Sequence, residues 1–442
     1  MIKKYLFGMM LCVLAGCQTQ TVESFDADRE LDYCAGQVTK ALEAIHEADG
    51  DYDFTMMPRN ILEGETVWSR RKASEQEWCS GFWPGVLWMT LESEELRMKN
   101  EEFLTPKGMS VAREATAIPV DSLKKVAEGY TEALAFLEKQ PAYDHDLGFI
   151  VINSFLKGYE QTQNETYKRI ALACADTLAT LFNSKVGTIL SWPRHVKDYG
   201  GHNTIMDNMM NLELLFWASQ ENEELREKNE KLYNIAVRHA ETTMKNHFRE
   251  DGSCYHVAVY DTLDGHFIKG VTHQGYADSS MWSRGQSWAI YGYTMVYRYT
   301  KDQRFLDFAQ KVTDIYLKRL KKTSDDMVPI WDMDAPVGQR EKDVSAACVV
   351  ASALLELCKY VDAEKGKTYR EAAISMLRDL STERYQSRSK NVSFLMHSTG
   401  HHPAGSEIDA SIIYADYYYL EALCKLKAIE LALNGQGAAK GI

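Results

Sequence analysis

The stretch Trp78-Cys79-Ser80-Gly81-Phe82-Trp83-Pro84-Gly85 is the first of six segments in which polar and aromatic residues run directly into a helical pattern. The other five opening segments occupy residues 143–149, 202–208, 277–286, 341–345 and 401–409, and the interval between them is roughly 60 to 75 residues. A second helical pattern without such an opening lies between each pair. Because one helix pair cannot bury its own apolar stripe, a regular series of pairs must stack or close on itself.

The 3.6-residue period of the apolar positions predicts twelve helices in six pairs. We expect them near residues 30–48, 81–97, 120–140, 149–162, 165–183, 205–220, 229–247, 283–300, 303–321, 343–362, 366–385 and 409–432. Short strands are expected within 253–261 and 326–331, and long loops at 50–77 and 99–117.

Six helix pairs with polar and aromatic residues gathered at one rim predict an all-α (α/α)6 barrel. This is a closed toroid with six inner and six outer helices. An open solenoid of helix pairs is the alternative. The opening segments carry different chemical groups rather than a repeated one. That variety favours the closed toroid, in which the six segments converge on one site.

The N-terminus has the pattern of a bacterial lipoprotein signal. Lys3 and Lys4 precede an apolar run that is too short to span a bilayer permanently, and Leu14-Ala15-Gly16-Cys17 resembles a lipobox. We expect a signal peptide over 1–16, a tether over 17–29, the barrel domain over 30–434 and a tail over 435–442. The chain would then lie in the cell envelope on the periplasmic side, held to the membrane only by a lipid on Cys17. A plain cleaved signal peptide is the alternative.

Charge and motif content exclude several classes of function. The net charge is −13, and the loss of residues 1–16 removes two lysines and no acid, so nucleic acid is not an expected partner. The cysteines are scattered, and no histidine pair has the spacing of a zinc site. A serine nucleophile elbow, a P-loop and a dinucleotide fingerprint are missing from the sequence. We therefore expect chemistry without a metal or a cofactor.

Asp207 is the leading candidate for an acid. Thr204 and Asp207 have the spacing of a capping box, in which both side chains would only satisfy the start of a helix. The neighbouring Ile205, Met206 and Met209 support another interpretation, because apolar surroundings raise the pKa of a carboxyl group that faces an opening. A raised pKa suits a proton donor.

Asp146 is the second candidate, and it also precedes a helix, so it could be a simple N-cap. Two carboxylates that meet in one mouth push their pKa values apart, which leaves one of them protonated near neutral pH. We expect Asp207 to be the neutral member and Asp146 the ionised one. Asp144 is a weaker competitor on the same turn.

Aromatic residues are concentrated in or near the opening segments, as in a saccharide-binding cleft whose rings stack on sugar faces. They include Trp83, Trp192, Trp282 and Trp288. Trp288 follows Trp282 at near-helical spacing and could instead belong to the core. Arg284 lies in an uncharged stretch, where it could form a structural ion pair or bind a carboxylate of a ligand or of a catalytic acid.

Together these segments resemble glycoside hydrolase family 88, the unsaturated glucuronyl hydrolases. The matching pieces run in order over nearly the whole mature chain: 78–85, 145–149, 191–193, 205–212, 272–276, 282–288 and 414–418. The resemblance implies an (α/α)6 barrel that acts on oligosaccharides bearing a 4,5-unsaturated uronic acid, with no cofactor. It also implies Asp207 as general acid/base and Asp146 as its essential partner. The sugar subsite implied by it comprises His145, Trp83, Trp192, His256, Gln274, Trp282, Arg284 and Trp288.

The reaction implied by this resemblance is hydration of a double bond. Protonation of C4 by Asp207 would place positive charge on C5, water would add there, and the unstable product would release the rest of the chain. Competing interpretations are a sister hydrolase for unsaturated galacturonyl or rhamnogalacturonyl ends, a polysaccharide lyase on a similar toroid, and a non-catalytic glycan-binding lipoprotein.

Overall fold

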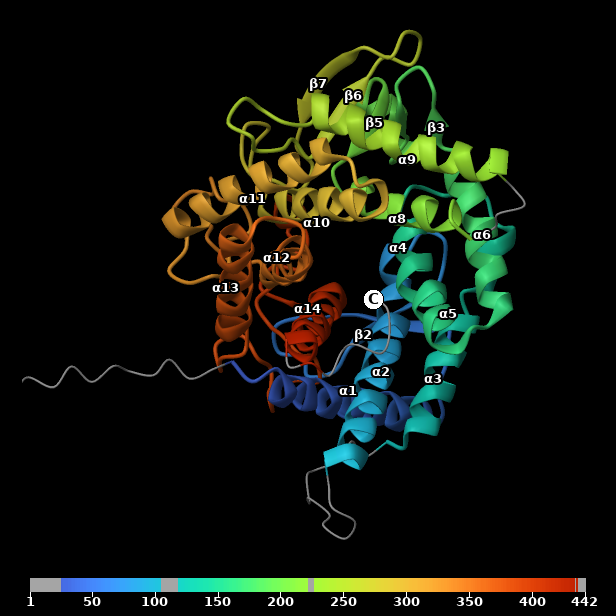
Figure 1. The fold of residues 1–442 in the computed structure, drawn as a ribbon, viewed down its shortest axis with the longest axis vertical. Coiled ribbons are helices and arrows are strands. Elements are labelled where there is room, and N and C mark those ends of the chain that lie inside the picture. Colours follow the sequence, from blue (N-terminus) through green and yellow to red (C-terminus); the bar gives the residue numbers. More distant parts are fainter. Residues whose placement is uncertain (1–24, 105–117, 222–225, 434, 436–442) are drawn as a thin grey trace, which may run out of the picture.

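A ring of paired helices forms the body of the protein, and the computed structural model describes residues 25–104, 118–221, 226–433 and 435 of it (Figure 1). The inner helices are α2 (Phe82–Leu104), the run from α4 (Leu147–Val151) to α5 (Lys157–Thr162), α8 (Asn208–Ala218), α10 (Ser283–Thr300), α12 (Val344–Leu357) and α14 (Ile413–Leu433). The outer helices are α1 (Ala27–Asp49), α3 (Val120–Glu132), α6 (Glu165–Ala179), α9 (Arg226–Asn246), α11 (Gln303–Thr323) and α13 (Ala363–Leu380).

The ring is closed, because α14 packs against both α12 and α2. Each remaining inner helix packs against the next one along the chain. The predicted (α/α)6 barrel is confirmed, and the open solenoid is wrong. The apolar pattern explains which helix lies inside: every residue of α12 is buried, whereas α11 buries a single stripe and carries charges on its outer face.

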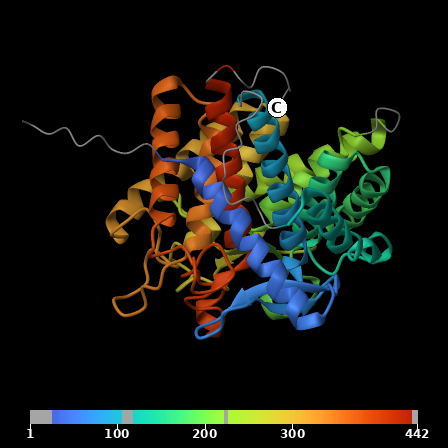
Figure 2. The same cartoon turned by 90° about the horizontal axis from the view of Figure 1, so that it is seen from below.

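All six opening segments lie immediately before inner helices, so they meet at one end of the barrel, which we call the mouth. Figure 2 shows the barrel from the side, with short strands and long connections gathered at this end. One three-stranded sheet has the order β5-β6-β7, with β5 (His202–Ile205), β6 (Val257–Tyr260) and β7 (Phe267–Val271). A second has the order β2-β1-β8, with β1 (Met56–Ile61), β2 (Ser69–Lys72) and β8 (Ser411–Ile412). The pair β3 (Phe182–Asn183) and β4 (Thr188–Ile189) completes the strands of the described residues.

Several boundaries differ from those predicted. The expected strand at 253–261 is present as β6, but 326–331 contributes only an isolated bridge between Ile330 and Lys342. The stretch 50–77, expected as a loop, contains β1 and β2, because β1 pairs with β8 across the mouth. The helix expected at 149–162 is interrupted by one π-helical turn, Ile152–Leu156.

The N-terminal boundary also differs, and it bears on the expected tether. Helix α1 already begins at Ala27, because the Asp26 side chain accepts a hydrogen bond from the backbone N–H of Arg29. The predicted signal peptide, Cys17 and most of the predicted tail lie outside the described residues. Among the helices that the structure describes, none combines the length and the apolar character that crossing a membrane requires.

A glycine joins the first opening segment to the second, and its replacement tests this packing. A Cβ atom on Gly81 would lie 2.7 Å from the Cα atom of Ile150. We expect Gly81→Ala to lower the free energy of unfolding by about 1–3 kcal/mol, because backbone must shift to admit the methyl group. Gly36→Ala in α1 is the matched control: a Cβ there meets nothing within 4 Å, and we expect a gain of about 0.5–1 kcal/mol. Thermal unfolding of both variants would refute the packing if Gly81→Ala were neutral.

Candidate active site

Two aspartates occupy equivalent places at the mouth. Asp146 stands at the N-cap position of α4 and Asp207 at that of α8, yet neither side chain makes a capping hydrogen bond in the described structure. About a seventh of each side chain is exposed, 15% for Asp146 and 14% for Asp207. The capping interpretation is therefore wrong for both residues. Thr204, the expected partner in a capping box, lies in β5 and shares a hydrogen bond of 2.8 Å with Thr188 instead.

The packing of two inner helices brings these aspartates together. Asn211 of α8 accepts a hydrogen bond of 2.6 Å from the backbone N–H of Phe149 in α4. The approach is so close that a side chain at Gly148 would collide with Asn211. The backbone N–H of Met206 donates to the carbonyl oxygen of His256 at 3.0 Å, which holds the segment before α8 against β6. Both carboxyl groups consequently face one mouth, as predicted.

A histidine faces each aspartate, and backbone groups determine which hydrogens these histidines carry. The Nδ1 atom of His145 lies 3.0 Å from the carbonyl oxygen of Ser191, so this nitrogen must be the donor. Burial lowers the pKa of His145, and the ring is therefore neutral at neutral pH. Its Nε2 atom, 3.3 Å from an oxygen of Asp146, is left with a lone pair. Such a contact is favourable only when the carboxyl group of Asp146 carries the hydrogen.

His256 has the opposite arrangement. Its Nδ1 atom accepts hydrogen bonds from the backbone N–H groups of His273 at 3.3 Å and Gln274 at 3.1 Å. The hydrogen of the ring must therefore be on Nε2, which lies 3.5 Å from an oxygen of Asp207. A donor in this position favours an ionised carboxylate on Asp207.

The surrounding charges agree with these two tautomers. Burial, followed by the charges of Asp144 and Asp207, raises the pKa of Asp146 well above its ordinary value. Burial also pushes the pKa of Asp207 upward, but the N–H of His256, 3.5 Å away, and the positive charge of Arg284 act in the opposite direction, and the pKa lies below its ordinary value. The two tautomers and these pKa directions favour the proton on Asp146 rather than on Asp207, which is the reverse of the expected assignment.

Aromatic rings form the wall of the mouth next to Asp207. The Trp282 ring lies 4.4 Å from that of His256, and the Trp192 ring lies 5.0 Å from that of His273. Trp192 is held from behind, because its backbone N–H donates to Asn203 at 2.9 Å. Its ring stacks on that of Tyr199. These contacts bring Trp192, Trp282 and His256 together, and their role in a sugar subsite stays a prediction.

Gln274 and Arg284 lie beside this wall but are occupied by protein partners. The Gln274 amide donates to the carbonyl oxygen of Gly400 at 3.0 Å. Arg284 is buried and forms an ion pair of 2.6 Å with Asp343, and it also donates to the carbonyl oxygens of Thr399 and Gly400. Of the two roles considered for Arg284, the structure shows the structural ion pair. It joins the starts of α10 and α12 to the segment before α14.

Trp83 and Trp288 are core residues, which corrects their assignment to the sugar subsite. Trp83 points away from the mouth and packs edge-on against Tyr130 of α3. Trp288 is fully buried among inner helices, with its ring 5.5 Å from that of Phe149. Trp83 falls on the face of α2 that is turned to the outer helix α3, whereas Trp288 lies on the inward face of α10, where residues of α4 and α14 cover it.

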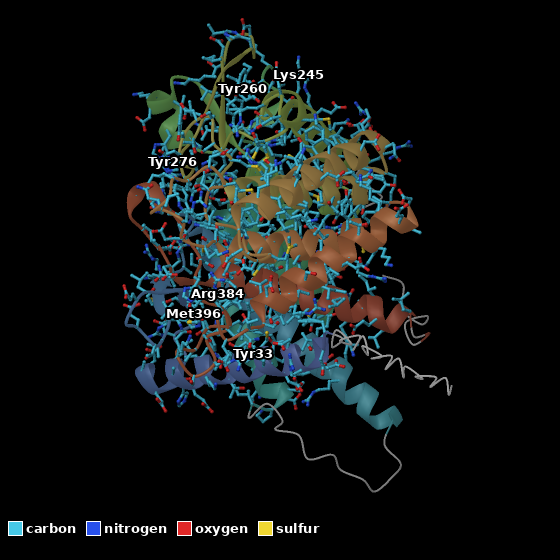
Figure 3. The ribbon with its side chains drawn as sticks, turned by 90° about the vertical axis from the view of Figure 1, so that its left-hand side faces the viewer. Tyr33, Lys245, Tyr260, Tyr276, Arg384 and Met396 are labelled. Carbon is cyan, nitrogen blue, oxygen red and sulfur yellow. The ribbon has the colours of Figure 1, made fainter. Side chains whose placement is uncertain are left out.

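Three residues without a predicted role lie at the opposite side of the mouth. Arg59 of β1 donates to both carboxylate oxygens of Glu407, at 2.9 and 3.0 Å, and lies over the ring of Trp78. Trp78 could have been identified as a mouth residue from the sequence, because it begins the first opening segment. Arg59 and Glu407 could not have been identified from the sequence, since only the pairing of β1 with β8 brings them to the mouth. Tyr276 lies at the surface of the same end, where it is 49% exposed (Figure 3).

Two groups of side chains have the composition of a metal site. Asp144, His145 and Asp146 offer ligand atoms within 4.8 Å of one another, as do the more exposed Asp261, Asp264 and His266. In the first group, Asp144 is engaged by Arg194 at 2.8 Å and by the backbone N–H of Asp146 at 3.0 Å. We assign no metal to it, because the arrangement already satisfies these oxygens.

Comparison with known proteins gives a consistent picture. A family model described as Glycosyl Hydrolase Family 88 matches residues 114–427. An unsaturated glucuronyl hydrolase of Formosa agariphila is 39% identical over 372 residues, which covers 83% of each chain. An unsaturated chondroitin disaccharide hydrolase of Streptococcus pneumoniae is 33% identical over 359 residues, or 79% of this chain and 81% of the relative. A crystal structure of an unsaturated glucuronyl hydrolase specific for heparin matches with a TM-score of 0.76 at 34% identity, covering 91% of this chain and 97% of the other.

Buried histidines behind the mouth predict a loss of stability in acid. Burial lowers the pKa of His202 to about 4 and that of His247 to about 3. Below an unfolded-state pKa of about 6.5 the unfolded chain binds protons that the folded chain does not, so stability falls as the pH drops from there toward these values. Each such histidine contributes a slope of up to about 1.4 kcal/mol per pH unit.

Unfolding temperatures measured between pH 4 and 7 test this expectation. His247→Phe should flatten the dependence on pH, because one depressed group is gone. His266→Asn is the control, since His266 is 60% exposed and should leave the slope unchanged. An unaltered slope in His247→Phe would contradict the assignment.

Proposed function

The chain belongs to glycoside hydrolase family 88, and from this premise we propose that it releases the 4,5-unsaturated glucuronyl residue from the non-reducing end of oligosaccharides made by polysaccharide lyases. The chain is a glycoside hydrolase. Relatives named for unsaturated glucuronyl and chondroitin disaccharide substrates support the substrate class. One observation carries the proposal: two partly exposed aspartates share a mouth. Asp146 faces a hydrogen-bond acceptor, and Asp207 faces a hydrogen-bond donor.

The anionic substrate prepares this pair for the reaction. A uronate carboxylate adds negative charge to the mouth and displaces water from the exposed carboxyl surfaces, and both effects raise carboxyl pKa values. The lone pair that His145 presents to Asp146 favours the proton on Asp146 in the ligand-free protein. The additional proton that is taken up when the substrate binds therefore goes to the carboxylate of Asp207. A neutral Asp146 adds no repulsion toward the substrate carboxylate.

In the reaction that follows, Asp207 is the general acid and then the general base. It donates its proton to C4 of the unsaturated ring, and positive charge develops on C5, where the ring oxygen shares it. Water attacks C5 while the ionised Asp207 accepts a proton from it. The resulting hemiketal opens to a ketone at C5, and the hemiacetal left at C1 collapses and expels the remaining sugar. We propose Trp192 and Trp282, whose rings lie 6.0 and 4.4 Å from that of His256, as the aromatic residues that contact the sugar.

Loss of the ultraviolet absorbance of the conjugated acid measures this reaction directly. We expect wild-type protein to remove the absorbance of unsaturated chondroitin or heparin disaccharides. Asp207→Asn should lower the rate by at least about 10²–10⁴-fold, because it removes the proposed acid and base, while binding of the disaccharide persists. Asp264→Asn, on the exposed β6–β7 hairpin, is the control and should retain full activity.

Three outcomes would overturn the proposal. Growth of the absorbance with a polysaccharide substrate would identify a lyase. Full activity in Asp207→Asn would remove the proposed acid, and binding without turnover in the wild type would identify a glycan-binding protein.

We further propose that a lipid on Cys17 holds the chain to the membrane of the cell envelope, on the periplasmic side. The lipobox pattern Leu14-Ala15-Gly16-Cys17 supports this localisation. Asp28, near the start of α1, forms an ion pair of 2.6 Å with Lys427, 14 residues into α14 and thus about 21 Å along its axis from the mouth. A tether leaving from this place keeps the mouth clear of the attachment point.

Replacement of the lipid-bearing cysteine tests this localisation. We expect Cys17→Ser to move the protein from the membrane fraction to the soluble fraction, with unchanged activity per molecule. Fractionation of cells followed by immunodetection measures the distribution. Wild-type protein found in the soluble fraction would rule out the anchor and would leave the proposed activity untouched.

A further inference from the structure

A third aspartate lies behind Asp146 and is not one of the two proposed catalytic residues. Asp144 is 4% exposed, and its two carboxylate oxygens have separate partners. One accepts a hydrogen bond of 3.0 Å from the backbone N–H of Asp146. The other accepts one of 2.8 Å from Arg194, which follows Trp192 on the neighbouring turn Pro193–His195. This places a buried negative charge two residues from the carboxyl group of Asp146, on a fixed backbone.

The Arg194 guanidinium closes this arrangement from the solvent side. Its side chain is 38% exposed and lies over the ring of Tyr143, 4.6 Å from the ring centre. Because the Arg194 side chain is partly exposed to water, solvent screens its charge. Arg194 therefore compensates the charge of Asp144 only in part. The remaining negative field acts on Asp146.

We propose that Asp144 and Arg194 are positioning residues that set the proton occupancy of Asp146, with Asp144 holding the proton on and Arg194 limiting that effect. The proposal deepens the proposed function and rests on it for its kinetic consequence. If Asp146 were ionised, its charge would repel the carboxylate of the entering uronate. A neutral Asp146 thus improves substrate binding more than it changes the chemical step.

Other charged and titratable groups also face Asp146, and the proposal takes account of them. They are Asp144 and His145 on its own segment, Asp207 at the start of α8, Arg194 on the turn after Trp192, Arg59 of β1 and Cys79 before α2. Arg59 is engaged by the Glu407 carboxylate, which reduces its field. The lone pair on Nε2 of neutral His145 favours the same protonated state. After burial, the charge of Asp144 is the largest influence that raises the pKa of Asp146.

Substitutions that remove one charge at a time test the proposal. Asp144→Asn keeps the acceptor for the backbone N–H of Asp146 but removes the negative charge, so Asp146 should ionise at lower pH. Arg194→Gln removes the compensating cation, so Asp146 should ionise at higher pH. With unsaturated disaccharide as substrate, the pH at which KM begins to rise should move by roughly one unit, downward and upward respectively. The kcat value on the plateau should change much less than KM.

A spectroscopic titration gives a readout that needs no turnover. The infrared band of a neutral carboxyl group, identified by its absence in Asp146→Asn, should persist to neutral pH in the ligand-free wild type. It should disappear at lower pH in Asp144→Asn and at higher pH in Arg194→Gln. Arg194→Lys keeps the charge and is the matched control, with the band and the KM profile unshifted.

The outcomes separate this proposal from the proposed function. Shifts of both variants in the same direction, or a band missing from the wild type at neutral pH, would overturn the role of Asp144 and Arg194. A wild type without hydrolase activity would overturn the proposed function, while the infrared titration would still decide which residue holds the proton. If Asp144→Asn failed to fold, the contrast between Arg194→Gln and Arg194→Lys would remain decisive.

Discussion

The chemistry of the mouth depends on backbone groups that fix the hydrogens of two buried histidines. The carbonyl oxygen of Ser191 accepts a hydrogen bond from Nδ1–H of His145. Two backbone N–H groups donate hydrogen bonds to Nδ1 of His256. The remaining nitrogen of each ring therefore meets its aspartate with opposite polarity. Two carboxyl groups in similar surroundings become chemically different in this way, without any difference in residue type.

The closed ring makes this asymmetry possible. Asp146 and Asp207 stand at the starts of neighbouring inner helices, and closure forces all six helix starts to one end. Side chains then join these starts across the mouth: Asn211 joins α8 to α4, and Arg284 joins α10 to α12 and to the segment before α14. A buried arginine paired with a buried aspartate adds little net stability, but removal of one partner leaves an unpaired charge. Such pairs specify one arrangement of the rim.

Electrostatics also explain how an acidic protein accommodates an acidic ligand. The chain has a net charge of −13, and Arg59, Arg194 and Arg284 near the mouth are all paired with carboxylates. Retention of a proton on Asp146 reduces the negative charge that an entering uronate meets. In the proposed function, Trp192 and Trp282 would add affinity that does not depend on charge.

Much of the fold and half of the site could be predicted from the sequence. The period of the apolar residues determined the number of helix pairs, and polar residues before every second helix located the rim, because these patterns are local and must match the burial of each face. The same reasoning located Asp146, Asp207, Trp192 and Trp282. It missed Arg59 and Glu407, because strand pairing between residues more than 300 positions apart has no local signature.

Local pattern also did not show that Trp83 and Trp288 are buried, since an opening segment reveals neither the direction nor the depth of a side chain. The tertiary structure alone decided the protonation of the pair. Apolar neighbours in sequence suggested that Asp207 would be neutral. The donor of His256, brought by a strand that the sequence places some 50 residues away, reversed that expectation. A pKa is set by the charges and hydrogen bonds around a group in space, and the chain acquires those only when it folds.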